Sequence, residues 1–86
     1  MITARQSRAA RALLGWTQEI LADKARVSLT ALKRLESENG LAVYETTRDQ
    51  VRRALEDNGI VFLNSDRGEG VMIVDDTRGQ GRASAN

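Results

Sequence analysis

Apolar residues recur at helical spacing through roughly the first 58 residues and change to short continuous runs after residue 59. The helical part divides into four segments separated by Gly or by hydroxyl-bearing residues. The later runs, "IVFLNS" (60–65) and "VMIVDD" (71–76), are rich in β-branched residues and flank the Gly-containing "DRGEG", which favours a hairpin. The pattern therefore predicts a mainly α fold of four helices followed by a C-terminal β-hairpin.

Capping residues indicate where the first three helices begin. Thr3 with Gln6 three positions later forms a capping box, and Gly15 suits a left-handed C-terminal cap. Thr17 is predicted to cap a second helix of about two turns, and Ser28 a third helix. Only a few residues separate the second and third helices, so the angle between them is closely constrained.

The ends of the last two helices follow from glycines. The third helix is predicted over 29–39, with Gly40 as its stop. The fourth is predicted to start near Thr46 or Thr47, with Gly59 in the capping position.

The third helix has two distinct faces. Leu32 and Leu35 are expected to point inward at helical spacing. The opposite stripe is predicted to consist of Leu29, Thr30, Lys33, Arg34 and Ser37.

The amino-acid composition restricts the classes of function that the chain can have. With 86 residues the chain is one small domain, and it contains no Cys and no His. These absences exclude disulfides, thiolate or imidazole metal ligands and the usual general base, so neither an enzyme nor a cofactor is expected. No segment reaches the ~18 apolar residues of a membrane span, which predicts a soluble, cytoplasmic protein. No small-molecule ligand is indicated.

Charge is unevenly distributed along the chain, although the formal net charge is only +1. Residues 1–34 contain seven basic and two acidic residues, a net charge of +5, and the remaining 52 residues carry −4. Such an asymmetry favours a polyanionic partner, but solvated helices also carry such excesses.

The segment "RALLGWTQEILADKARVSLTALKRLE" resembles the helix-turn-helix of the Cro or phage-repressor type, also called the XRE family. The shared signature is "GWTQ..LA.KA.VS...L.RLE", and the resemblance covers roughly residues 3 to 58. It implies a four-helix, lambda-repressor-like domain over 1–59 whose recognition helix, 28–39, enters the major groove of double-stranded DNA.

The resemblance also implies a set of DNA contacts. The expected base contacts are Leu29, Thr30, Lys33 and Arg34. The expected phosphate contacts are Arg11, Thr17, Gln18, Ser28 and Ser37. The resemblance further implies that Gln18 braces the recognition helix. Of the two cations on the helix, Arg34 is the better candidate for guanine, because its planar fork fits O6 and N7.

Plainer alternatives exist for these residues. Lys33 and Arg34 could be solvated, and Leu29 and Thr30 could face water instead of a thymine methyl group. Arg11 with Glu36 matches a family pair close to a phosphate, but an ordinary structural ion pair has the same residues.

Two positions depart from the family pattern. Arg26 stands where the family usually has Gly, so a non-Gly residue is expected to adopt positive φ at some energetic cost. Ile20 stands where the family more often has a charged residue, and its side chain is expected to be exposed.

The hairpin has apolar residues on both faces, which predicts that both faces pack against other parts of the protein or against a partner. One face can pack on the helices, and a two-stranded hairpin alone is marginal in water. We therefore predict a homodimer formed through the element 60–76, by pairing strands across a two-fold axis. The alternative is a monomer whose hairpin covers only its own helices. The predicted dimer contacts are Ile60, Val61, Phe62, Leu63, Val71, Met72, Ile73 and Val74.

These features predict a sequence-specific transcriptional regulator, most simply a repressor that binds an inverted-repeat operator as a homodimer. The polar tail over 77–86, "TRGQGRASAN", is expected to be disordered. One alternative is a DNA-binding antitoxin whose tail folds on a toxin. Another is a protein-interaction module whose apolar hairpin adds strands to a partner's sheet.

Overall fold

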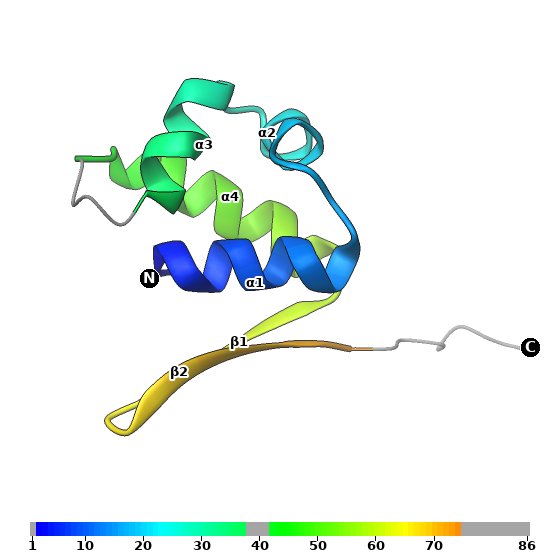
Figure 1. Cartoon of the computed structure of the whole chain (residues 1–86), viewed down its shortest axis with the longest axis vertical. Helices are drawn as coiled ribbons and strands as arrows, with labels where there is room; N and C mark the ends of the chain where they lie inside the picture. The colour runs from blue at the N-terminus through cyan, green and yellow to red at the C-terminus, as the bar shows by residue number, and fades with distance from the viewer. Residues whose placement is uncertain (1, 38–41, 75–86) are drawn as a thin grey trace, which may run out of the picture.

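The computed structural model describes residues 2–37 and 42–74 of the chain. In these ranges four helices precede a two-stranded antiparallel sheet (Figure 1). The elements are α1 (Ala4–Leu14), α2 (Gln18–Ala25), α3 (Leu29–Glu36), α4 (Glu45–Asp57), β1 (Ile60–Ser65) and β2 (Gly68–Ile73). The prediction of a mainly helical chain with a C-terminal hairpin is confirmed, whereas the predicted tail, 77–86, lies outside the described residues.

The predicted caps are confirmed. Thr3 and Gln6 form the reciprocal capping box of α1, and Gly15 ends the helix with φ +70°. The hydroxyl oxygens of Thr17 and Ser28 each accept a hydrogen bond from the backbone N–H three residues further on, at 3.1 and 3.0 Å. Local side-chain chemistry therefore sets where these three helices begin.

The third helix is shorter than predicted. It ends at Glu36, not at residue 39, because Ser37 has the extended angles φ −80° and ψ 141°. The Arg8 guanidinium donates to the main-chain oxygen of Glu36, which satisfies a carbonyl that a further helical turn would have used. The predicted stop, Gly40, lies outside the described residues.

The fourth helix begins slightly earlier than predicted. Its first residue is Glu45, and Tyr44 precedes it without a side-chain capping bond. At the other end Asn58 is the capping residue, and Gly59 follows it with φ +97°. The predicted Gly59 cap is therefore one residue late, although this glycine does take the left-handed conformation.

One apolar core joins the helices to the first residue of β1. Figure 1 shows α1 and α4 lying between α3 on one side and the hairpin on the other. In the described part of the chain, no helix is long and apolar enough to cross a membrane. The buried apolar residues are Ile2, Ala10, Leu21, Ala22, Ala25, Leu32, Leu35, Val51, Ala54, Leu55 and Ile60.

The second strand starts earlier than predicted. The register pairs Ile60 with Ile73 and Phe62 with Val71, so apolar side chains lie opposite each other. This pairing extends to Gly68 and leaves only two residues, 66 and 67, in the turn. The "DRGEG" loop and the strand start at residue 71 were therefore wrong. The cross-strand apolar pairs fix the register, so Gly68 and Gly70, which the sequence assigned to the loop, lie in the second strand.

The two faces of the hairpin differ in burial. On the inner face, Ile60 is 2% exposed, and Phe62 and Val71 are partly buried against the core. These three predicted dimer contacts are thus occupied by the chain's own helices, and the buried Ile60 side chain is not available to a second chain. Ile73, opposite Ile60, stays 40% exposed. The outer face carries Val61, Leu63, Met72 and Val74, all between 37% and 48% exposed.

Candidate nucleic-acid interface

Three of the four predicted base-contacting side chains are exposed on one face of α3. Thr30, Lys33 and Arg34 are exposed, and their spacing of three and four residues places them side by side on the helix. Leu32 and Leu35, on the opposite face, are 0% and 2% exposed. Leu29 differs from the other three, because it is half-buried and packs against the core.

The two cations on this face are not neutralised within the described residues. The five arginines 5, 11, 48, 52 and 53 each pair with a carboxylate. No described carboxylate pairs with Lys33 or Arg34, although both side chains are exposed. The α3 face therefore presents two positive charges available to an external anion.

A short connection fixes α3 relative to α2. Arg26 ends α2 in the left-handed conformation, with φ +59° and ψ +44°, as the sequence predicted for this non-Gly residue. The next residue, Val27, donates its N–H to the main-chain oxygen of Ala22 at 3.0 Å and packs partly buried against the core. Ser28 then begins α3, so a single turn both ends one helix and orients the next.

Glu36, the last residue of α3, is a buried carboxylate that joins three helices. Arg11 of α1 donates to it through Nη2 at 2.8 Å and through Nε at 3.0 and 3.2 Å. The Ser7 hydroxyl, also from α1, donates at 2.6 Å, and Gln18 Nε2 of α2 donates at 3.0 Å. We call these four residues the Glu36 cluster. It fastens the C-terminal end of α3 to both preceding helices.

The carboxylate of this cluster stays ionised. Burial by itself raises the pKa of Glu36, but hydrogen bonds from Arg11, Ser7 and Gln18 outweigh it, and the resulting pKa lies below the ordinary 4.5. Since every neighbour is a donor, the site is complementary to an anion and not to a neutral carboxyl group. At neutral pH the cluster is therefore a charged ion pair, with its hydrogen bonds satisfied, among the four helices α1 to α4. We call these four helices the helical layer.

The predicted phosphate contacts fall into two groups. Arg11 and Gln18 direct side-chain donors inward to Glu36, which is the structural ion pair that the sequence left as the alternative for Arg11. Thr17 and Ser28 are exposed, and their oxygens act as caps while the hydroxyl protons remain for an outside acceptor. The remaining member, Ser37, is half-buried at the end of α3.

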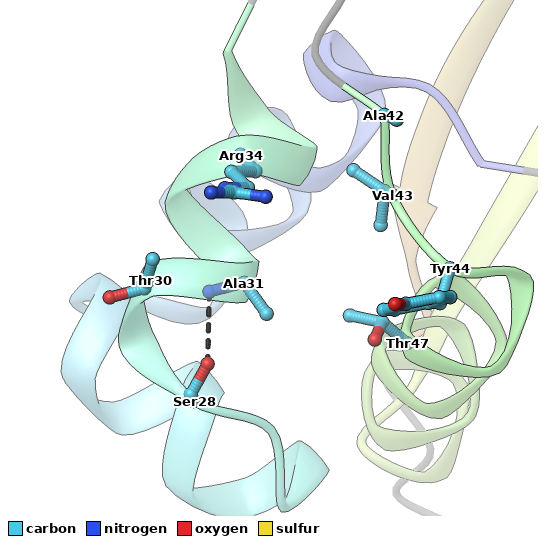
Figure 2. A pocket seen from close by; sticks show the side chains of 8 residues that line it. All are labelled: Ser28, Thr30, Ala31, Arg34, Ala42, Val43, Tyr44 and Thr47. Carbon is cyan, nitrogen blue, oxygen red and sulfur yellow. Dashed lines mark hydrogen bonds between the residues drawn. The ribbon is translucent and has the colours of Figure 1, made fainter.

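Sequence reasoning missed the other wall of this surface. A pocket of about 400 Å³ lies between α3 and the segment that leads into α4, and Thr30, Ala31 and Arg34 line it. Figure 2 shows Ala31 pointing toward that segment. Tyr44 on that segment is 83% exposed, and Thr47 follows one helical turn later. The available signal was that Tyr44 is one of only three aromatic residues in the chain, at a position where no apolar periodicity requires it.

Two further arginines of α1 have specific partners. Arg5 pairs with Glu69 of β2 at 2.9 Å, and Arg8 holds the end of α3. Ile20 is 40% exposed on α2, as its departure from the family pattern predicted.

The site offers no metal centre within the residues that the structure describes, since no group of three His, Cys, Asp or Glu is placed to hold an ion. Comparison of the chain with protein-family models, with curated proteins and with solved structures finds no match.

Proposed function

We propose that this chain is a sequence-specific regulator of transcription that binds double-stranded DNA. In this proposal α2, the turn at residues 26–28 and α3 act as a helix-turn-helix, and α3 enters the major groove. The simplest regulatory action is repression, by occupying an operator.

The observation that carries the proposal is the exposed row Thr30, Lys33 and Arg34. These two cations have no carboxylate partner in the described residues, so both charges are available to a phosphate or a base edge. The guanidinium of Arg34 can donate two parallel hydrogen bonds to O6 and N7 of guanine. Each good bidentate contact contributes about 1–3 kcal/mol of discrimination against a wrong base.

The rigidity of the helix pair supports the same proposal. Reading base edges requires the recognition helix to keep its angle to the rest of the protein. The Glu36 cluster holds one end of α3, and the turn at Arg26 and Val27 holds the other. In this arrangement Arg11 and Gln18 position the helix, and Thr17 and Ser28 remain candidates for phosphate.

The small size of the exposed α3 face supports a homodimer. One α3 can contact only a few base pairs, whereas two copies related by a two-fold axis would read an inverted repeat. The exposed outer face of the hairpin supports self-association. It also supports a second candidate function, a protein-interaction module, in which the hairpin binds another protein and α3 has no nucleic-acid role.

Selection from a random pool of double-stranded DNA tests the proposal. The expected result is a consensus with two inverted half-sites about one helical turn apart. Arg34→Ala should then weaken binding by about 5- to 150-fold for each half-site, equivalent to ~1–3 kcal/mol each, and relax the preference at one base position of each half-site.

The matched control is Arg67→Ala. Arg67 lies in the hairpin turn and is exposed, and the change removes the same charge far from α3. If R34A and R67A lower affinity equally, the binding is unspecific and the recognition role of α3 is wrong. If no sequence is enriched, and K33E/R34E leaves the biological activity intact, the interaction module replaces the DNA proposal.

A further inference from the structure

Among the residues that the structure describes, the two-stranded sheet has two free edges, and its register shows which main-chain groups point outward. Val74 donates its N–H to the carbonyl of Gly59 at 2.7 Å, so this pair is hydrogen-bonded. Bonded pairs recur at every second residue of an antiparallel ladder. The outward-pointing N–H and C=O groups on β1 therefore belong to Ile60, Phe62 and Asn64.

The strand β2 carries a charged residue that is paired with α1. The main-chain N–H and C=O of Glu69 point outward, while its carboxylate, on the inner face, accepts from Arg5 at 2.9 Å and from the Thr3 hydroxyl at 3.1 Å. Helix α1 packs against β2, and Arg5 and Ala9 line a pocket with residues 68–71. A charged pair and a neighbouring helix are features that keep an edge strand from pairing with another chain.

The free edge of β1 has none of these features. Its six residues, "IVFLNS", contain no charged residue, no Pro and no Gly. Val61 and Leu63 are 37% and 48% exposed beside this edge. An uncharged, apolar strand edge is a template for another strand, and an antiparallel copy of itself meets no charge repulsion.

The position of α3 decides between two ways of joining copies. In Figure 1, α3 and the hairpin lie on opposite sides of α1 and α4. If two hairpins stacked through their outer faces, the two α3 helices would point away from each other and could not face one DNA duplex. Edge pairing about an axis perpendicular to the sheet places both helical layers on the same side.

We infer that β1 pairs antiparallel with β1 of a second copy of this chain, which gives a continuous four-stranded sheet with the order β2, β1, β1 and β2. This assignment rests on the proposed function for the requirement that both α3 helices face the same way. Val61 and Leu63 then lie beside their symmetry mates on the outer face. Met72 and Val74 lie one strand further from the axis.

The absence of Cys from the chain allows a direct test by single and paired cysteines. Residues 61 and 63 point their main-chain groups toward β2, so across the dimer they form the close, non-bonded pairs. The two-fold axis can pass at residue 61, 62 or 63. The corresponding variants are Val61→Cys, the double variant V61C/L63C and Leu63→Cys.

The matched controls are Met72→Cys and M72C/V74C on β2. Leu63 and Met72 are 48% and 47% exposed on the same face, so their reactivity toward solvent is comparable. Each purified variant is oxidised in a glutathione buffer without DNA, and covalent dimer is followed on non-reducing gels.

One of the β1 variants should crosslink about tenfold faster than either β2 variant, because a disulfide needs Cβ atoms within ~4.5 Å of each other. Equal rates on both strands would indicate stacked faces, and faster crosslinking on β2 would indicate the other edge; either overturns the assignment. Absence of crosslinking in all five variants also overturns it.

The same variants separate this assignment from the proposed function. DNA affinity is measured on each after reduction. Faster crosslinking on β2, with intact binding to the selected consensus, removes the β1 edge and leaves the DNA role. Crosslinking on β1 without any enriched DNA sequence leaves the dimer and removes the DNA role.

Discussion

The helical layer and the hairpin differ in how their polar and apolar side chains are buried. In the helical layer even a charged group is satisfied internally, since the buried Glu36 accepts from Arg11, Ser7 and Gln18. In the hairpin, apolar side chains such as Leu63 and Met72 remain nearly half exposed on the outer face. The helices thus satisfy a buried charge within one chain and leave scattered apolar side chains such as Ile20 exposed, whereas the hairpin gathers four partly exposed apolar side chains on one face.

This difference separates two roles in the proposed regulator. A closed, saturated helical layer keeps α3 at a fixed angle. The free edge of the hairpin joins a second copy of the chain, which supplies a second α3. Changes in the helical layer should therefore affect stability at any protein concentration, and changes on the outer face of the hairpin should mainly affect association.

The largest expected effect comes from truncating one leucine in each region. Leu32→Ala removes a side chain with 0% exposure and should lower the free energy of unfolding by about 2–5 kcal/mol, since it leaves a cavity between α3 and the core. Leu63→Ala should lower it by no more than about 1 kcal/mol, because nearly half of that side chain is already in water. Urea denaturation measures both. A loss at Leu63 as large as that at Leu32 would contradict the contrast between the regions.

A smaller effect is expected from neutralising one carboxylate in each region. Glu36→Gln should destabilise by about 2–3 kcal/mol, below the full range for a broken buried pair because the Arg11 side chain is 20% exposed. The new amide group would also face only donors from Arg11, Ser7 and Gln18.

The matched control on the hairpin is Glu69→Gln. Its partner Arg5 has a side chain 73% exposed, so the pair should contribute at most about 1 kcal/mol. The same denaturation experiment compares the two variants. Equal losses would mean that the Glu36 cluster holds α3 no more firmly than a surface ion pair would.

The pH dependence should come chiefly from the helical layer. Because the folded-state pKa of Glu36 lies below its ordinary 4.5, its ionisation stabilises the fold at pH values above 4.5. That stabilisation is lost as the pH falls through the lowered folded-state pKa. Asp49, whose pKa is lowered mainly by its hydrogen bond from Arg52, acts in the same direction. In E36Q, unfolding measured between pH 7 and pH 3 should show a shallower acid loss but not a flat profile.

Local signals in the sequence were sufficient for the starts of the first three helices. Thr3, Thr17 and Ser28 cap helices because each needs only a nearby N–H, a relation contained within three residues. Helical periodicity likewise identified the buried Leu32 and Leu35. Such features depend on neighbours in the chain, so the chain order alone reveals them.

Features set by distant contacts were not predictable in this way. The end of α3 depends on Arg8, 28 residues away in sequence, and the start of β2 depends on the cross-strand pair of Phe62 and Val71. In the Glu36 cluster, the resemblance suggested the Arg11 pair and the bracing role of Gln18, but no pattern in the sequence indicated the buried Ser7. These contacts exist only once the helices are packed.

The smallest expected effect concerns the turn between α2 and α3. Arg26 is the one non-Gly residue at positive φ among those described, and a side chain there carries a cost that glycine does not. Arg26→Gly should therefore raise the free energy of unfolding by about 1 kcal/mol relative to Arg26→Ala, which loses the same charge but keeps the Cβ. Thermal unfolding of the two variants measures the difference. Since neither change touches the hairpin, both variants should crosslink and sediment as the unaltered chain does. A change in association would mean that the turn and the hairpin are coupled, and that the helical layer is not the independent unit inferred from its saturated contacts.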